Sequence, residues 1–244
     1  MKNIVTITIG EGASNVFSHI RSGNTTPMLI DADEIALFYK NFPEENKLFI
    51  PVVRGCCIVN KYENRQKEIQ DGISAIQDQI KNKLGSYRMA IVLVGMGGYS
   101  SSCTVALIAE ILNEIHLPAV YILSFPFRIE GVVRFRNAIH GLTNLQKQSS
   151  AIITFSLEFI KNHYTEIESI LEVFSQADKV FAAFHDHTIN YLKTLDEYQA
   201  INQTALLNSF EQSELNHFMI DEIDEMRKLY DDFLKDRPYY KDLD

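Results

Sequence analysis

The stretch Ala90–Glu110, AIVLVGMGGYSSSCTVALIAE, decides the fold. Its first five residues are apolar or small, a pattern typical of a short buried strand. Gly95, Gly97 and Gly98 follow at once, and glycines let the backbone turn sharply and expose its N–H groups. Three serines, 100–102, then stand where a helix should begin, because hydroxyl side chains are good N-caps.

A strand, a glycine loop and a helix N-terminus in this order favour a bound anion such as phosphate. Free N–H groups and the helix dipole both attract negative charge there. The alternative is an ordinary strand-to-helix turn without a ligand, since glycine loops are common. The formal net charge of −9 argues against a general binder of nucleic acid or anionic membranes. A bound phosphate would therefore be held mostly by backbone dipoles.

The length of 244 residues, with 46% hydrophobic and 23% charged, predicts one large globular domain or two small ones. The chain holds no apolar run of the roughly 18 residues that a membrane span needs. Its N-terminus enters a strand without a signal peptide's cleavage region. Cys56, Cys57 and Cys103 give no paired framework, which favours reduced thiols in a cytoplasmic protein.

Short β-rich segments alternate with helical ones along the first two thirds of the chain. The predicted strands are 3–9, 28–30, 48–53, 90–94, 119–123 and 151–155. Helical spacing is found near 16–20, over 62–84, after 100 and over 132–145. This order predicts an α/β fold, with a Rossmann-like, mostly parallel sheet covered by helices on both faces.

After Phe155 the sequence reads as helix only. Residues 167–192 predict one long, largely buried helix, and one or two amphipathic helices follow from Glu197. The tail 211–244 holds eleven acidic residues against five Lys or Arg, which favours a solvated surface over a partner surface.

Four loops leave the carboxyl ends of predicted strands, after Ile9, Ile30, Val94 and Leu123, and all of them carry Gly, Asp or Ser. Parallel sheets bind ligands at these ends of their strands. The convergence therefore favours a nucleotide site more strongly than a single glycine loop does.

Five segments together resemble the FtsZ/tubulin family. They are GMGG (95–98) with Ser100 and Ser102 in place of threonines and a helix carrying IAE, PFRIEGVVR (126–134), IGEGASN (9–15), DADEIAL (31–37) and EVFSQADKV (172–180). The matches fall in the family's order across residues 3–193. The resemblance implies a guanine-nucleotide-binding domain with a long central helix, and a GTP or GDP ligand with Mg²⁺ as an optional companion.

The resemblance also implies a role for each matched residue. The loop 95–102 would cradle the α- and β-phosphates, Asn15 would approach the base, and Glu130 with Arg134 would hold the ribose. Phe174 would stack on the base, and Asp178 would accept hydrogen bonds from guanine N1–H and its amino group. The implied nucleotide-binding set is Gly10, Gly12, Asn15, Gly95, Met96, Gly97, Gly98, Ser100, Ser101, Ser102, Glu130, Arg134, Phe174 and Asp178.

Each of these residues has a simpler interpretation. Phe174 fits a core aromatic, Asp178 a solvated helix residue, and Glu130 with Arg134 an i,i+4 surface pair. His185 and His187 invite a metal site, but residues i and i+2 of a helix do not face each other, so no metal ligands are identified.

The sequence departs from the family pattern at several points. Tyr99, Ser101 and Cys103 replace glycines, and any of them at a positive φ would be strained. Glu11 would repel phosphate unless it points away or meets a Mg²⁺ ion. The third loop, 54–60, lacks the family's later glycines, and the asparagine expected after the sixth strand is absent from TFSLE (154–158).

The domain organisation expected from these patterns is a nucleotide-binding domain over 1–193 and an acidic helical extension over 194–244. The family's second domain, whose acids promote hydrolysis in the next subunit, is expected to be absent. No catalytic residue is identified, and hydrolysis would need acids supplied in trans.

Two hypotheses of different classes remain. In the first, the chain binds guanine nucleotide, has weak or no GTPase activity alone, and acts as a switch or by assembly with itself or a partner such as a full-length relative. In the second, the fold is kept without nucleotide and serves as a protein-interaction module. A dinucleotide is less favoured, because no acid follows at the spacing usual for a ribose contact.

Overall fold

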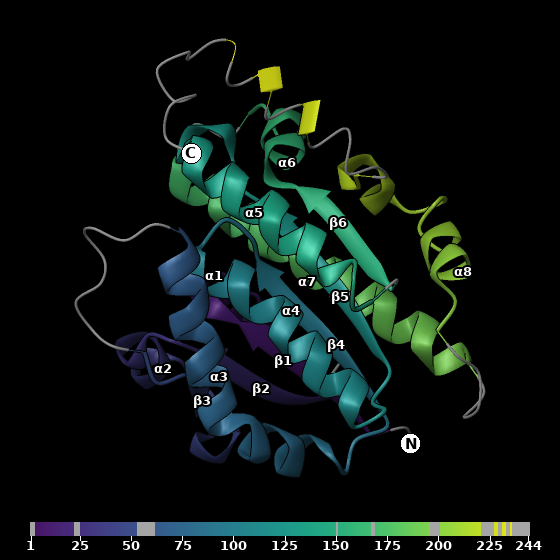
Figure 1. The fold of residues 1–244 in the computed structure, drawn as a ribbon. Helices are drawn as coiled ribbons and strands as arrows, with labels where there is room; N and C mark the ends of the chain where they lie inside the picture. The colour runs from purple at the N-terminus through teal and green to yellow at the C-terminus, as the bar shows by residue number, and fades with distance from the viewer. Residues whose placement is uncertain are drawn as a thin grey trace.

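The computed structural model describes residues 3–21, 25–52, 62–149, 151–166, 169–195 and 201–220, with a few more between 227 and 235. Figure 1 shows their arrangement. The strands are β1 (Ile4–Ile9), β2 (Thr25–Asp31), β3 (Lys47–Phe49), β4 (Met89–Gly95), β5 (Ala119–Phe125) and β6 (Ile152–Ser156). Within these residues, no helix is both long enough and apolar enough to cross a membrane.

The helices are α1 (Gly10–Val16), α2 (Glu34–Tyr39), α3 (Tyr62–Leu84), α4 (Tyr99–Glu114), α5 (Val132–Leu145), α6 (Leu157–His163), α7 (Ile170–Thr194) and α8 (Gln203–Asn208). Helices alternate with the strands as far as α6, and α7 and α8 then follow without a strand between them. Four short 3₁₀ turns complete the described part: η1 (Phe17–His19), η2 (Glu44–Asn46), η3 (Arg128–Glu130) and η4 (Glu214–Phe218).

The six strands form one sheet in the order β3-β2-β1-β4-β5-β6, and every neighbouring pair is parallel. The arrows in Figure 1 accordingly point to the same end of the sheet. The chain moves outward from β1 through β2 to β3, then returns to pair β4 with the other side of β1. In such sheets the crevice for a ligand lies where the strand order reverses, here between β1 and β4.

Helices cover both faces of the sheet, as the sequence predicts. Successive strand residues point to opposite faces, so Val92 belongs to the core beneath α3, α4 and α5, and Ile91 to the core beneath α1 and α7. The single apolar stripe of α3, which includes Ile73 and Ile80, packs into the first of these cores. The long helix α7 buries Phe181 and Phe184 in the second.

The structure differs from the predicted elements at three places near the site. The first helix begins at Gly10, so the first glycine loop is itself helical, whereas the sequence suggested a helix near 16–20. The segment predicted only as a second loop contains α2, which Asp33 caps by accepting from the N–H groups of Ile35 and Ala36. The third strand ends at Phe49, before Pro51, which has no N–H to donate to a sheet.

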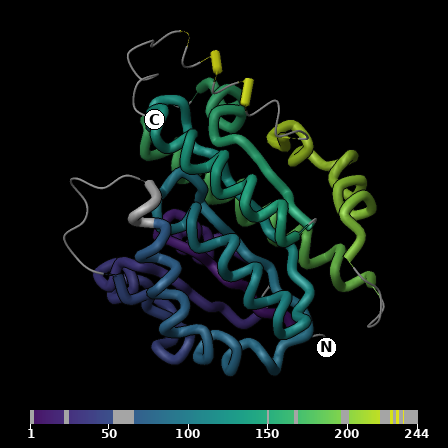
Figure 2. The backbone as a smooth tube through the Cα atoms, in the orientation of Figure 1, coloured from purple at the N-terminus to yellow at the C-terminus, as the bar shows by residue number. Residues whose placement is uncertain are grey.

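Residues 201–220 cover the outer edge of β6 (Figure 2). The Gln203 side chain accepts from the Ile152 N–H (2.9 Å) and donates to the Ile152 carbonyl (2.8 Å), so it pairs with both backbone groups of one edge residue. Ile220 N–H donates to the Thr154 carbonyl at 2.9 Å. The segment thereby satisfies edge groups that would otherwise face solvent.

Candidate functional site

A cavity of about 400 Å³ lies at the reversal of strand order, where β1, β4 and β5 end. Its lining residues are Gly10, Glu11, Gly12, Asn15, Gly95, Met96, Gly98, Ser101, Ser124, Glu130, Arg134, Leu157, Phe174, Ala177, Asp178 and Phe181. The structure thus brings together eleven of the fourteen residues implied by the resemblance, leaving out Gly97, Ser100 and Ser102. Segments far apart in the chain converge here because all the strands end on this side.

The loop after β4 is held in shape by its own polar groups. Gly97 has φ +96°, and a Cβ there would lie 3.1 Å from Arg134 Cβ, so the position requires glycine. Gly97 N–H donates to Ser102 Oγ at 3.0 Å, and its carbonyl accepts from Asn137 Nδ2 at 3.1 Å. Both backbone groups of Gly97 are therefore used inside the protein, and Gly97 supports the loop from behind the cavity.

The serines of this loop do not cap the helix, contrary to the sequence prediction. α4 begins at Tyr99 with Gly98 as N-cap and without a side-chain cap. The Ser101 hydroxyl instead donates back to the Gly95 carbonyl at 2.8 Å, which closes the loop on itself. The prediction placed the helix start one to three residues too late, because a glycine N-cap gives no hydroxyl signal.

The residues that replace family glycines cause no backbone strain. Tyr99, Ser101 and Cys103 all lie within α4, and His116 alone among the described non-glycine residues has a positive φ. Cys103 is buried in the core. The three substituted positions therefore need no glycine in this structure.

Two helix N-termini meet in the wall of the cavity. A Cβ on Gly10, at the start of α1, would lie 3.2 Å from the Ser101 Cβ in the first turn of α4. The first N–H groups of a helix have no acceptor within it, so both turns present donors. With the dipole of the 16-residue α4 behind them, these donors suit a phosphate group.

Glu130 and Arg134 pair with each other on the cavity wall. Arg134 Nη1 lies 3.2 Å from Glu130 Oε2, and the other carboxylate oxygen of Glu130 accepts from the Phe127 N–H at 2.9 Å. The Glu130 side chain is 18% exposed and that of Arg134 is 52% exposed. Arg134 is therefore the member of the pair with surface left to meet a ligand.

Phe174 and Asp178 lie on one side of α7 and face the cavity. Phe174 keeps 40% of its surface exposed and meets Phe127 edge-on, with ring centroids 5.1 Å apart. Burial raises the pKa of Asp178 above its usual value of 3.8, while the charges of His19 and Lys40 lower it. A partly exposed ring and a half-buried carboxylate together suit a planar base with hydrogen-bond donors on its edge.

Lys40, which follows α2, is a part of the site that the sequence reasoning missed. Its ammonium donates to Asn15 Oδ1 and lies 3.7 Å from Glu11 Oε1. Glu11 lines the cavity, but this contact offsets its negative charge without a metal ion. Nothing in the local sequence of Lys40 indicates this role, because the contact joins residues 25 positions apart in the chain.

Other predicted features lie apart from the cavity. The loop after β2 lines none of it, although Asp31 lies close enough to Glu11 for their charges to interact. Leu157 lines the cavity just after β6, in the segment where the expected asparagine is absent. The third loop, 54–60, and Cys56 with Cys57 lie outside the described residues.

The paired histidines of α7 point to different partners. His185 is fully buried, and its ring nitrogens contact Thr6 Oγ1 at 2.9 Å and Asp186 Oδ1 at 3.2 Å. His187 contacts Ser209 Oγ at 3.1 Å. In the part of the chain that the structure describes, no three His, Cys, Asp or Glu side chains gather as a metal site would require.

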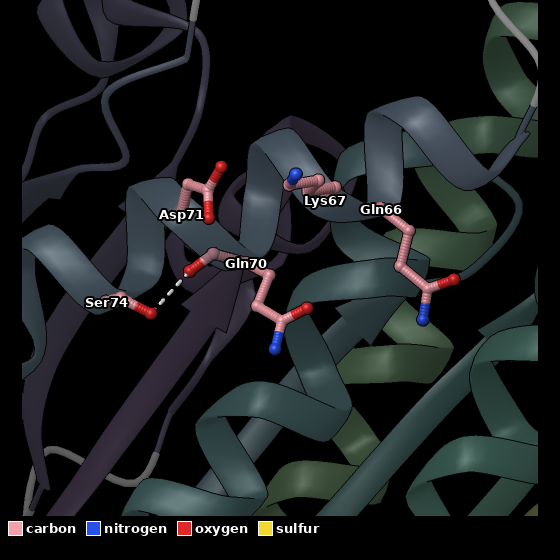
Figure 3. Close-up of a pocket in the computed structure, with 5 residues that line it drawn as sticks. All are labelled: Gln66, Lys67, Gln70, Asp71 and Ser74. Atoms are coloured by element: carbon pink, nitrogen blue, oxygen red, sulfur yellow. Dashed lines mark hydrogen bonds between the residues drawn. The ribbon is translucent and has the colours of Figure 1, made fainter.

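Two further cavities are each lined by only one or two segments of the chain, unlike the first. One, of about 490 Å³, runs along a single helix and is lined by Gln66, Lys67, Gln70, Asp71 and Ser74 (Figure 3). There the Ser74 hydroxyl donates to its own helix, at the Gln70 carbonyl. The other, of about 560 Å³, lies between η1 and α7 and is lined by Ser18, His19, Ile20, Arg21, Lys179, Ala182, Ala183 and Asp186.

Known proteins match this chain over its α/β part. The model of the Tubulin/FtsZ family GTPase domain matches residues 3–165. Cell division protein FtsZ of Pseudomonas aeruginosa is 27% identical over 183 residues, which is 73% of this chain and 45% of that protein. FtsZ of Aquifex aeolicus is 25% identical over 182 residues, covering 73% and 48%. The chain spans just under half the length of these relatives.

Solved structures of similar fold agree. FtsZ of M. jannaschii, as an empty dimer, superposes with a TM-score of 0.64 at 18% identity, covering 85% of this chain and 60% of that one. CetZ2 from Haloferax volcanii, as a GTPγS-bound protofilament, gives 0.62 at 17% identity, covering 85% and 62%. At these identities the likeness establishes the fold alone. Because the family model covers more than half of the sequence, the chain belongs to the Tubulin/FtsZ family.

Proposed function

We propose that the chain binds guanine nucleotide in the cavity between β1 and β4. The observation that carries the proposal is the set of groups that line one cavity: the first turns of α1 and α4, and Phe174 with Asp178 on α7. A nucleotide has complementary groups, an anionic phosphate and a planar base with hydrogen-bond donors. Family membership supports the same assignment, since the CetZ2 relative is a GTPγS-bound protein.

The base preference in this proposal comes from Asp178. An ionised carboxylate accepts from guanine N1–H and the 2-amino group, a pair of donors that adenine lacks. Glu130 and Arg134 would border the ribose, and the first turns of α1 and α4 would hold the phosphates. Mg²⁺ is an optional companion of the phosphates, with no ligand assigned to it.

In this proposal the chain has weak or no GTPase activity alone and works as a switch, or by assembly with itself or a protein partner such as a full-length relative. The nucleotide-binding unit is residues 1–193 and the acidic extension is 194–244, in a cytoplasmic protein. Acids that promote hydrolysis would come from a partner.

The first experiment is to release nucleotide from the purified chain with acid, identify it by chromatography, and titrate GTP, GDP and ATP onto stripped protein. Stoichiometric guanine nucleotide, or selective binding of GTP or GDP, is the expected result. Equal binding of ATP would contradict the assignment of Asp178.

Asp178→Ala should weaken GDP binding by about tenfold or more and remove the preference over ADP, because it deletes a charged hydrogen-bond acceptor. Asp78→Ala, at an exposed acid on α3, is the matched control and should bind as the unmodified chain does. Calorimetric titration of both nucleotides measures the effect. Unchanged selectivity in the Asp178 variant would remove the proposed base contact.

A nucleotide-free interaction module is the second candidate. Two observations favour it: the loop after β4 uses backbone groups inside the protein, as at Gly97, and exposed apolar side chains lie close in sequence to the lining residues Glu130 and Phe174. Ile129 is 74% exposed and Leu171 is 76% exposed. The absence of any nucleotide binding near millimolar concentration would select this candidate and direct the search to a protein partner.

A further inference from the structure

Lys40 reaches from the end of α2 to the wall of the proposed nucleotide site. Its side chain is only 18% exposed, although lysine usually extends into solvent. The ammonium contacts Asn15 Oδ1 and Glu11 Oε1, both on α1, and Asn15 and Glu11 line the cavity. A long side chain held in one place by two polar partners has a defined position beside the cavity.

The contact with Lys40 fixes which way the Asn15 amide faces. An ammonium carries hydrogen-bond donors only, so the amide oxygen must turn toward it. The Asn15 NH₂ group is then the half left for the cavity. Asn15 thereby presents a donor to a bound base, where an unrestrained amide could present either a donor or an acceptor.

Lys40 also offsets the negative charge around the base. The acids Glu11 and Asp178 both lie within its field, at 3.7 Å for the carboxylate of Glu11. Burial raises the pKa of Asp178, and the Lys40 charge acts in the opposite direction, as does His19. The ammonium therefore favours the ionised carboxylate that can accept from guanine.

We infer that Lys40 is a positioning residue for base recognition: it holds the Asn15 amide so that its NH₂ group faces the bound base as a donor. This inference rests on the proposed function. Guanine offers the matching set, with donors at N1 and the 2-amino group and acceptors on its ring edge. Adenine carries an amino donor where guanine carries the acceptor O6, so an amide fixed as a donor toward that edge favours guanine.

The test compares GDP and ADP binding to the full chain and to three variants by calorimetric titration. Lys40→Met keeps the unbranched stem and removes the charge, and should lower the GDP-to-ADP affinity ratio by about tenfold. Lys40→Arg restores a cation with donors and should keep the ratio within about threefold. Lys147→Met is the matched control, since Lys147 also donates to an asparagine oxygen, Asn144 Oδ1 at 3.0 Å, on the distant end of α5.

The possible results distinguish failure of the Lys40 inference from failure of the proposed nucleotide binding. An unmodified chain that prefers GDP, together with a Lys40→Met variant of unchanged ratio, would overturn the inference and leave the proposed function standing. Equal weakening of GDP and ADP would also overturn it, because Lys40 would then act on affinity and not on the base. An unmodified chain that binds neither nucleotide removes the proposed function and the inference together. Thermal unfolding of each variant verifies that the fold is intact.

Discussion

Asp31 shows how a single residue near the site carries a cost in stability. It ends β2 with only 7% of its surface exposed, and its carboxylate accepts from the Asp33 N–H at 3.0 Å. Burial raises its pKa above the usual 3.8, and the charges of Asp33 and Glu11 raise it further, although backbone hydrogen bonds from Asp33 and Ala32 act against this. The ionised form is thus less favourable in the folded protein than in the unfolded chain.

Asp31→Asn should therefore stabilise the protein at neutral pH, by on the order of 1 kcal/mol. A raised folded pKa means that Asp31 contributes stability below its unfolded pKa of about 3.8 and loses it as pH rises through the folded value. The difference in unfolding free energy between variant and unmodified chain should grow from about pH 4 upward. Urea unfolding at several pH values measures it, with exposed Asp78→Asn as control; a difference that is constant with pH would contradict the argument.

The sequence predicts site residues unevenly, for a physical reason. Asn15, Phe174 and Asp178 belong to continuous motifs, so the family resemblance located them and the fold brings them to one cavity. Lys40 and Leu157 lie beside the same cavity without any motif of their own. Their positions depend on how α2 and α6 pack, which local spacing does not encode.

At the scale of whole elements, α5 is the support of the glycine loop. It approaches the start of α4 so closely that a Cβ on Gly141 would lie 2.6 Å from the Ser102 carbonyl oxygen and 2.7 Å from Met96 Cε. One turn earlier, Asn137 holds the Gly97 carbonyl. The close helix packing and this hydrogen bond together set the position of the loop.

Gly141→Ala should push α5 away from α4 and destabilise the protein by about 1–3 kcal/mol, the usual cost of overpacking. The glycine loop should shift with it, so GDP binding should weaken more than binding of guanosine, which has no phosphate. Gly12→Ala, where an added methyl meets nothing within 4 Å, should leave the unfolding free energy nearly unchanged. If the Gly141 variant bound GDP and guanosine more weakly by the same factor, the change would not act through the phosphate groups.

The sequence predicts best those helices and strands in which most residues are apolar and buried. Strands such as 90–94 are continuous apolar runs, because both faces of a parallel sheet are covered, and their prediction is correct to within a few residues. The start of α1 was missed because its first turn, Gly10–Gly12, has poor helix propensity and is held by tertiary packing. The short α2 was missed because its six residues give too little periodicity.

In the whole molecule, residues 201–220 belong to the same core as the sheet. Phe210 is fully buried, with its ring centroid 5.5 Å from that of Phe184 on α7. Phe218 is buried in the same cluster, and Gln203 pairs with the backbone of β6. This packing tests the expected boundary at 193/194. If the extension were a separate part, its removal would leave the rest of the molecule stable.

A chain ending at residue 200 should therefore lose most of its stability. Burying a phenylalanine is worth about 1.5–3 kcal/mol, so losing Phe210, Phe218 and the edge contacts of Gln203 approaches the roughly 5–15 kcal/mol that holds a typical domain together. The exposed edge of β6 should also promote aggregation.

A chain ending at Ile220 keeps all of these contacts and should melt within a few degrees of the full chain. Soluble yield, size-exclusion chromatography and thermal unfolding compare the two truncations. If residues 1–200 alone melt cooperatively near the temperature of the full chain, the boundary at 193/194 separates independent parts and the shared core is unimportant.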